Sequence, residues 1–326
     1  MKKLVSANTE YNNKRFTMTV LYEEDEAAEI AVENGGIRCG NIYVGYVENV
    51  PKTTGGAFVR SADGATGYLP PNRMKDVVFK NIKKDDVIKP GDEIIVQVET
   101  ESIGEKHAVL SCRLKGNREL LDELKEKGIH RTCGTCLYRA PSAAKMFLDR
   151  YKKEAFSRIV TDNEDIFGEL KGAAAFYDDR LVSLYKLYNF STLLDRSLEK
   201  KVWLPCGGFL YIEQTEAFVS IDVNSGKAVK GIKDDERFLQ INLEAAYEAA
   251  GQIRRRGLSG TILIDFISMK SKEANDRLLE EFRSISAADP VYTNAVDITS
   301  LGIMEITRHK VKRPLKRQLE CAECSI

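Results

Sequence analysis

Two short apolar segments that run into aspartate constrain most strongly what this chain can fold into. AFVSIDV spans residues 217–223, and TILIDF spans residues 261–266. Between them, residues 237–257 have the apolar spacing of a long helix that ends at Gly257. A right-handed strand–helix–strand crossover lays its two strands parallel. The pattern predicts an α/β domain from residue 201 onward, with a largely parallel sheet and with Asp222 and Asp265 meeting at one rim.

The two aspartates each follow an isoleucine in an apolar strand, so their carboxylates are expected to be buried. Burying a carboxylate costs free energy unless hydrogen bonds or a cation compensate it. Two such carboxylates also repel unless one is protonated or a cation lies between them. Oxygen ligands of this kind suit Mg²⁺ or Mn²⁺, and Asn224 can add an oxygen or orient a water. The alternative is that Asp222 and Asp265 each cap a helix or a turn.

Residues 41–113 form a series of short apolar strands separated by turns rich in Gly, Pro and Asp. Five short strands over about seventy residues predict a small Greek-key barrel of the OB type. Residues 117–128 have the apolar spacing of an amphipathic helix, and a second helix is expected to start near Ser142, after Pro141.

The charge of the chain is balanced, with 49 Lys and Arg against 49 Asp and Glu. Basic residues gather at residues 308–317, which is typical either of a solvated face or of a nucleic-acid contact. The N-terminus has no apolar core of a signal peptide, and no apolar run reaches the roughly 18 residues of a membrane span. A cytoplasmic protein is therefore expected. The seven cysteines then favour reduced thiols or metal ligands over disulfides.

Several segments together resemble the catalytic region of the ribonuclease E/G family. They are, in chain order, GNIYVGYVENV, GAFVRSADGATGYLP, KGIHRTCG, VWLPCGGFLYIEQTEAFVSIDVNSGKA, NLEAAYEAAGQIRRRGLSGTILIDFISM and SLGIMEITRHK. The resemblance covers almost the whole chain, and SIDVNSG with GLSGTILIDFI is its most specific part.

The resemblance implies an Mg²⁺-dependent endoribonuclease that cuts single-stranded RNA and leaves 5′-phosphate products, in ribosomal RNA maturation or messenger RNA turnover. Asp222 and Asp265 match the metal ligands, and Asn224 matches the residue that assists water or phosphate. The metal would activate water for in-line attack. Two alternatives remain: a non-catalytic single-stranded RNA-binding protein on the same scaffold, and a phosphohydrolase of small molecules. Retention of all three residues favours the nuclease.

Three residues of the barrel region are implied to bind the RNA strand: Phe58 and Tyr68 as base-stacking aromatics, and Lys106 as a phosphate contact. Stacking on an aromatic ring is worth about 1–3 kcal/mol per base and tolerates any sequence. The alternative for Phe58 and Tyr68 is that they belong to the core of the barrel.

Arg131 and Thr132 resemble the pair that senses a 5′-monophosphate, in which a guanidinium and a hydroxyl share the phosphate oxygens. The sequence departs from the family here, because the stretch between the barrel and the catalytic strands is shorter than usual. Tyr292 also stands near the usual place of a further basic residue of the sensor. Ser268, in DFISM, replaces another acid that is common in the family.

The resemblance implies an α/β chain of several domains, with the OB barrel inserted before a mixed α/β catalytic domain. On this division, N-terminal strands at residues 1–38 are RNase H-like and are expected to pack with the later α/β region. The parts that follow are the OB-fold RNA-binding barrel at 39–115, a shortened 5′-end sensor at 116–145 and the RNase H-like remainder at 146–200. The α/β catalytic domain at 201–318 and a zinc-link-like tail at 319–326 complete the division.

The Cys-x-x-Cys pair formed by Cys321 and Cys324 supplies half of a tetrahedral zinc site. In the family, two subunits share one structural Zn²⁺ through such pairs, which implies a homodimer. The first alternative is a site completed within the chain by Cys133 and Cys136, and the second is that both pairs are free thiols.

Overall fold

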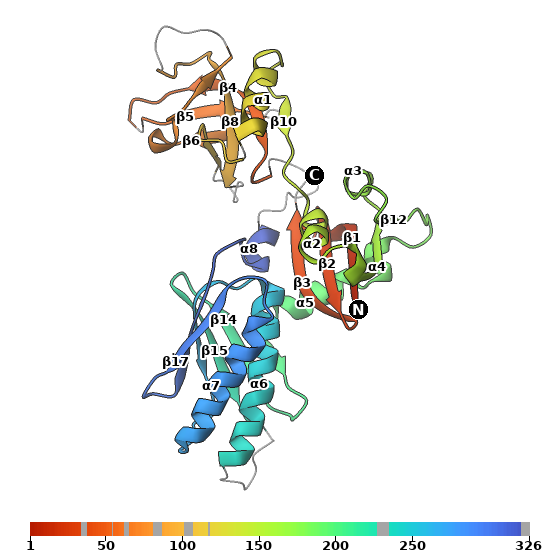
Figure 1. Cartoon of the computed structure of the whole chain (residues 1–326), viewed down its shortest axis with the longest axis vertical. Helices are drawn as coiled ribbons and strands as arrows, with labels where there is room; N and C mark the ends of the chain where they lie inside the picture. Colours follow the sequence, from red (N-terminus) through yellow and green to blue (C-terminus); the bar gives the residue numbers. More distant parts are fainter. Residues whose placement is uncertain are drawn as a thin grey trace. The chain divides into compact units, whose positions relative to one another are not determined.

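The computed structural model describes residues 1–33, 38–53, 55–61, 65–80, 87–100, 107–116, 118–226 and 235–320 (Figure 1). The chain forms two compact units. The first comprises Met1–Ala7, Met18–Val32 and Tyr151–Gln318, and the second comprises Asn8–Thr17 and Glu33–Arg150 together with Leu319 and Glu320. The finer domain limits stated above stay a prediction.

Three sheets organise these units. Five strands form the first sheet, in the order β12 (Ala175–Phe176), β11 (Phe156–Thr161), β1 (Lys2–Tyr11), β2 (Lys14–Glu23) and β3 (Glu26–Glu33). Seven form the second, in the order β10 (Cys136–Tyr138), β4 (Ile42–Asn49), β5 (Ala57–Arg60), β6 (Thr66–Leu69), β9 (Ala108–Ser111), β8 (Glu93–Thr100) and β7 (Val78–Phe79). Six form the third, in the order β13 (Lys201–Trp203), β14 (Phe209–Gln214), β15 (Phe218–Asn224), β16 (Gly260–Asp265), β18 (Ile303–Arg308) and β17 (Thr293–Ile298).

The helices connect and cover these sheets. They are α1 (Arg118–Ile129), α2 (Ala143–Tyr151), α3 (Glu164–Glu169), α4 (Leu184–Leu187), α5 (Phe190–Leu198), α6 (Asp235–Arg256), α7 (Lys272–Ala287) and α8 (Leu315–Glu320), with 3-10 turns at Pro71–Arg73 and Lys153–Ala155.

The six-stranded sheet is mixed, and the expectation of a largely parallel sheet is wrong. Only β15 and β16, which α6 joins, run parallel; the β13–β14, β14–β15, β16–β18 and β17–β18 pairs are antiparallel. The reason lies in the short connections, because a turn of a few residues between β14 and β15 can only join antiparallel strands. The predicted crossover itself is confirmed.

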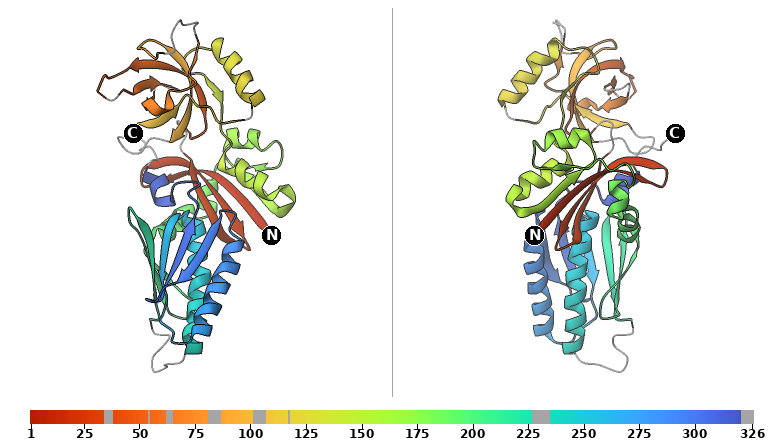
Figure 2. Two further views of the ribbon diagram at one scale, coloured as in Figure 1. Left: turned by 60° about the vertical axis from the view of Figure 1, so that its left-hand side comes forward. Right: turned by 90° about the vertical axis from the view of Figure 1, so that its right-hand side faces the viewer.

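Helices α6 and α7 lie against one face of the six-stranded sheet (Figure 2). Alternate residues of β15 and β16 point into this layer, and Ile221 and Ile264 are 1% and 0% exposed. Their partners on the helices are small or aliphatic, such as Ala245 on α6 and Leu278 on α7. Because strand side chains alternate, the residues between these buried positions point to the opposite face, where Asp222 and Asp265 lie.

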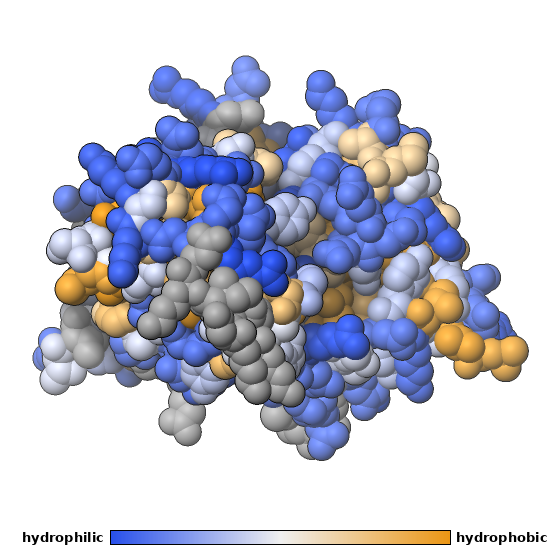
Figure 3. All heavy atoms as spheres, turned by 90° about the horizontal axis from the view of Figure 1, so that it is seen from below, coloured by the Kyte–Doolittle hydropathy of each residue, from blue (hydrophilic) through white to orange (hydrophobic). Residues whose placement is uncertain are grey.

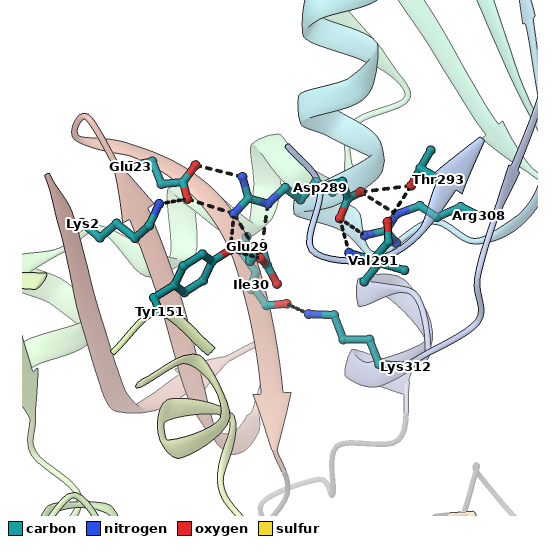
Figure 4. A network of polar contacts seen from close by, with 11 residues as sticks. Lys2, Glu23, Glu29, Ile30, Tyr151, Asp289, Val291, Thr293, Arg308 and Lys312 are labelled. Atoms are coloured by element: carbon teal, nitrogen blue, oxygen red, sulfur yellow. Dashed lines mark hydrogen bonds and ion pairs between the residues drawn. The ribbon is translucent and has the colours of Figure 1, made fainter. Parts of the chain in front are cut away.

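A buried ionic network joins α6 to the five-stranded sheet within the first unit (Figure 4). The Arg254 guanidinium donates to both carboxylate oxygens of Glu23, at 2.8 and 2.9 Å, and to Glu29 at 3.2 Å. It also donates to the Tyr151 hydroxyl at 2.9 Å. Burial opposes the ionisation of Glu23, but hydrogen bonds from Arg254 and Lys2 outweigh it and lower the Glu23 pKa to about 2.

A second ion pair closes the end of the six-stranded sheet. Arg308 on β18 donates to both oxygens of Asp289, at 2.8 and 3.2 Å (Figure 4). It also donates to the Leu258 carbonyl at 2.8 Å. The Arg308 and Asp289 side chains are 5% and 9% exposed. Arg308, the first of the basic residues at 308–317, is therefore a structural residue and does not face solvent.

The predicted five-stranded OB-type barrel is confirmed in the second unit. Strand β4 pairs with both β5 and β8, and β6 runs parallel to β9, so the order β4–β5–β6–β9–β8 closes on itself. The interior is aliphatic, with Val59, Leu69, Val96 and Leu110 fully buried. Helix α1 packs on the outside through Leu124.

The surface seen in Figure 3 is mostly hydrophilic, with hydrophobic side chains in smaller areas. None of the helices in the described part of the chain combines the length and the apolar character that crossing a bilayer requires.

Candidate active site and RNA-binding residues

Asp222 and Asp265 lie opposite each other on neighbouring strands. In the parallel pair β15–β16 their Cα atoms are register partners, as are Ile221 and Ile264 just before them. Neighbouring strands are about 4.8 Å apart, and register partners point to the same face. The sheet thus places two carboxylates side by side on the face that α6 and α7 leave uncovered.

Both carboxylates are exposed, which corrects the expectation that they are buried. The physical reason is the alternation along each strand: the isoleucine that precedes each aspartate takes the buried position, so the aspartate points the other way. The cost of desolvation is therefore no argument for a cation here. The mutual repulsion of two carboxylates held side by side is still an argument for a cation between them.

Asn224 belongs to the same constellation. It follows Asp222 by two residues on β15, so its side chain points to the same face, and its Nδ2 atom donates to the Asp222 carboxylate at 2.7 Å. This hydrogen bond orients both side chains. Neither aspartate is a helix N-cap, since Asp222 lies within β15 and Asp265 ends β16, whereas α6 begins only at Asp235 and α7 only at Lys272.

The turn after Asn224 depends on close approach of two backbone segments. Gly226 has a φ of +56°, and a Cβ atom there would lie 2.4 Å from the Gly207 carbonyl oxygen. A Cβ atom on Gly208 would lie 2.8 Å from the Asn224 carbonyl oxygen. The glycines on both sides therefore allow the loop before β14 to pack directly against the end of β15 and hold Asn224 in place.

The segment after Asp265 is held by two side chains of α6 that sequence analysis missed. Asn242, which is fully buried, donates to the Ile267 carbonyl at 2.8 Å and accepts from the Ile267 N–H at 3.0 Å. The Asp235 carboxylate accepts from the N–H groups of Lys270 and Ser271, at 3.0 and 2.8 Å. A polar residue at a helix position expected to be apolar was the available signal for Asn242.

The donor set fits Mg²⁺ better than zinc. Two exposed carboxylates and an amide oxygen are hard oxygen ligands, and Mg²⁺ in enzymes commonly uses one or two carboxylates while waters and substrate phosphates complete its shell. Among the described residues, no group of three or more His, Cys, Asp or Glu side chains is close enough to hold a metal by itself. Such a site would therefore depend on the substrate for further ligands.

Phe58 and Tyr68 lie on the outside of the barrel. They are register partners on β5 and β6, with ring centroids 5.4 Å apart, and both are half-buried and outside the aliphatic core cluster. The His107 ring lies edge-on to Phe58, also at 5.4 Å. A Cβ atom on Gly56 would lie 2.5 Å from the Tyr68 ring, so this glycine makes room for the ring. Lys106 lies outside the described residues.

Arg131 and Thr132 lie in the turn between α1 and β10, and both are exposed. The Thr135 N–H donates to the Thr132 carbonyl at 3.1 Å, which closes a turn that begins at Thr132. The two threonine hydroxyls are 3.2 Å apart. Within the described residues, Arg131 forms no ion pair, so its guanidinium is available to an external anion.

The cysteines do not form a metal site in the described part of the chain. Cys133 and Cys136 are free thiols, and burial raises the pKa of each, which opposes the thiolate form that zinc binds. The Cys136 thiol is directed to the Tyr138 carbonyl at 3.3 Å. Cys321 and Cys324 lie outside the described residues.

Comparison with known proteins identifies the family to which the chain is similar. The model of the Ribonuclease E/G family matches residues 72–311, well over half of the chain, and this range contains all three residues.

Individual relatives extend the match. Ribonuclease G of Haemophilus influenzae is 30% identical over 244 residues, which cover 71% of this chain and 48% of that protein. Ribonuclease G of Escherichia coli (strain K12) is 35% identical over 180 residues, which cover 54% of this chain and 36% of that protein. Ribonuclease E of Synechocystis sp. is 25% identical over 397 residues, which cover 95% of this chain and 58% of that protein.

The last alignment is longer than the chain itself, so that relative contains segments with no counterpart here. The chain spans about half the length, or less, of the two ribonuclease G relatives that it matches. With a family model matched over most of its length, the chain belongs to the ribonuclease E/G family.

Proposed function

We propose that this chain is an Mg²⁺-dependent endoribonuclease that hydrolyses single-stranded RNA and leaves a 5′-phosphate on the downstream product. The observation that carries the proposal is the register pairing of Asp222 and Asp265 on the exposed face of the sheet, in a member of the ribonuclease E/G family. The relatives named ribonuclease G and ribonuclease E support the same activity.

The two carboxylates and Asn224 have separate tasks in this proposal. Asp222 and Asp265 would hold the ion, which when bound supplies positive charge against the phosphodiester and makes a water more acidic. Asn224, whose amide N–H is hydrogen-bonded to Asp222, would orient the water or a phosphate oxygen. Exposure of both carboxylates leaves room for a substrate phosphate between them and solvent.

The reaction is a hydrolysis of one P–O bond. The oxygen of water forms a bond to phosphorus, and the bond between phosphorus and the 3′-oxygen breaks. The upstream fragment takes a proton on that oxygen and ends in a 3′-hydroxyl, whereas the downstream fragment keeps the phosphate at its 5′ end.

The barrel and the turn after α1 supply candidate contacts for the rest of the strand. Phe58 and Tyr68 offer two neighbouring aromatic rings outside the barrel core, which suits stacking of unpaired bases. Arg131 offers an exposed guanidinium for a 5′-phosphate, with the Thr132 hydroxyl beside it. Lys106 is proposed as a phosphate contact on the strength of the family resemblance.

The remaining parts of the proposal concern assembly and biological role. We propose that Cys321 and Cys324 supply half of a structural Zn²⁺ site shared by two subunits in a homodimer. The protein would act in the cytoplasm, in ribosomal RNA maturation or messenger RNA turnover.

A cleavage assay on short single-stranded RNA tests the activity. Wild type is compared with Asp222→Asn and Asp265→Asn, in Mg²⁺ and in EDTA, with Asp276→Asn on the exposed side of α7 as the matched control. We expect cleavage that requires Mg²⁺, falls by orders of magnitude in the first two variants and is unchanged in the control. Wild type that binds the RNA but leaves it intact would instead favour a non-catalytic RNA-binding protein.

A further inference from the structure

We infer that four residues beside the carboxylates, Lys201, Trp203, Phe209 and Tyr211, form a platform that stacks unpaired nucleobases next to the cleaved phosphodiester. We call these four residues the edge platform. The inference rests on the proposed function, because it assigns the bases of the same RNA substrate to a defined part of the catalytic sheet.

The register of the sheet places the edge platform in line with the carboxylates. Tyr211 on β14 pairs with Asp222 on one side and with Lys201 on the other, so Lys201, Tyr211, Asp222 and Asp265 form one row across four strands. In the next row, Trp203 pairs with Phe209, and Phe209 pairs with Asn224. Register partners share a face, so all these side chains lie on the face that α6 and α7 leave open.

Two aromatic residues of the platform, Trp203 and Tyr211, are exposed, and the Trp203 ring contacts that of the half-buried Phe209. Trp203 is 64% exposed and Tyr211 is 39% exposed, although both are large side chains on a regular strand. The Trp203 and Phe209 rings lie edge to face, with centroids 5.4 Å apart. The buried residues of these two strands, such as Leu210, point to the other face, so the core does not require the aromatic side chains.

A cation sits directly on these rings. The Lys201 ammonium is 4.0 Å from the Trp203 ring centroid and 3.8 Å from that of Phe209. Among the described residues Lys201 forms no ion pair, whereas its neighbour Lys200 pairs with Glu213 at 2.6 Å. An ammonium without a carboxylate partner, placed over exposed rings, combines the two features of single-stranded nucleic-acid sites: positive charge for the backbone and aromatic faces for the bases.

Spacing limits which bases the platform can take. Strands are about 4.8 Å apart, so Tyr211 is one strand from Asp222, and Trp203 is two strands from Asn224. When a phosphate of the RNA lies at the carboxylates, the adjoining nucleotides therefore lie over β14 and β13. A base in a duplex has both faces covered by its neighbours and cannot stack there, so the platform selects unpaired RNA.

Trp203 is the single tryptophan of the chain, so its fluorescence reports on the platform alone. The full chain carrying Asp265→Asn, which prevents cleavage, is titrated with a labelled single-stranded RNA of about ten nucleotides in Mg²⁺. The anisotropy of the label measures how much RNA is bound. We expect Trp203 emission to be quenched in proportion to the bound fraction.

Variants then measure what the platform contributes. In the same background, Trp203→Ala and Phe209→Ala are expected to weaken binding by about five- to a hundredfold each. Trp203→Phe, which keeps a ring, is expected to restore most of the affinity. Lys201→Gln is expected to reduce the slope of log affinity against log salt by about 0.7. Tyr247→Ala, which removes an aromatic ring that is 71% exposed on α6, is the matched control and is expected to bind unchanged.

The outcomes separate this inference from the proposed function. RNA that binds without changing Trp203 emission, with Trp203→Ala and Phe209→Ala equal to Tyr247→Ala, would overturn the platform while cleavage by the parent protein still stood. Equal quenching by a duplex of the same length would overturn it too, because the bases of a duplex are not available. Failure of the parent protein to cleave any single-stranded RNA would overturn the proposed function instead.

Discussion

Asn242 on α6 satisfies both backbone polar groups of Ile267, the second residue after Asp265. Its amide donates to the Ile267 carbonyl at 2.8 Å and accepts from the Ile267 N–H at 3.0 Å, and the side chain is fully buried. The helix therefore fixes the exact direction in which the chain leaves β16. Through that segment it positions Asp265 without touching it.

Replacing Asn242 by alanine removes the partner of both backbone polar groups of the partly buried Ile267. We expect a loss of about 1–3 kcal/mol in the free energy of unfolding, measured by chemical denaturation. As a positioning residue, Asn242 should also affect kcat more than KM in RNA cleavage. Gln240→Ala, at an exposed position of the same helix, is the control. A variant whose folded fraction cleaves at the wild-type rate would limit Asn242 to a structural role.

Arg254→Ala is predicted to be the most destabilising change of a charged residue in α6. It removes the cation that pairs with Glu23 and with Glu29, whose side chain is only 4% exposed. Breaking a buried pair by removing one partner costs about 3–5 kcal/mol, because the other charge stays buried. Arg237→Ala, on the exposed face of α6, should change the free energy of unfolding by no more than about 0.5 kcal/mol. Equal effects in the two variants would contradict the network's importance.

The same network predicts how stability depends on pH. The Glu23 pKa is lowered from 4.5 to about 2 in the folded protein, so its ionised form stabilises the fold. This contribution is complete above the unfolded value of 4.5 and is lost as the pH falls toward 2. Wild type should therefore exceed Glu23→Gln in Tm near neutral pH, and the difference should shrink steadily below about pH 4.5. A constant difference across this range would exclude Glu23 as its source.

Gly226→Ala should disturb the end of β15. The added Cβ would lie 2.4 Å from the Gly207 carbonyl oxygen, at a φ of +56°, so the turn must move. We expect lower thermal stability and lower cleavage activity. Gly168→Ala is the matched control, since that glycine lies in α3 with open space around it. It should leave activity unchanged and raise stability slightly, by up to about 1 kcal/mol. If Gly168→Ala lowered stability and activity more than Gly226→Ala, the close approach of Gly226 to Gly207 would be contradicted.

Much of the fold was predictable from local patterns. The barrel strands were found because each is short, apolar and bounded by turn residues. The β15–α6–β16 crossover was found because apolar periodicity changes from strand to helix and back between Phe218 and Asp265. The direction of the strands was mispredicted because short turns join β14 to β13 and β15, and β18 to β17, and such turns require antiparallel pairing.

The pairing of Asp222 with Asp265 was predictable from the sequence, but the exposure of their side chains was not. Matched aspartates after apolar strands located Asp222 and Asp265, but which face each side chain occupies depends on register, and the isoleucines before them take the buried side. Asn242 and the edge platform were missed because their roles come from contacts between segments far apart in the sequence: α6 with the end of β16, and β13 with β14 and β15.

In the proposed mechanism Asp222 and Asp265 act as one site, and a double-mutant cycle tests this most directly. Cleavage rates of single-stranded RNA are measured for Asp222→Asn, for Asp265→Asn and for the double variant, in saturating Mg²⁺ and with folding checked for each. Residues that act as a unit are strongly non-additive. We predict that the double variant cleaves no more slowly than the slower single variant. Rate losses that multiply in the double variant would contradict the claim, because the two carboxylates would then act independently.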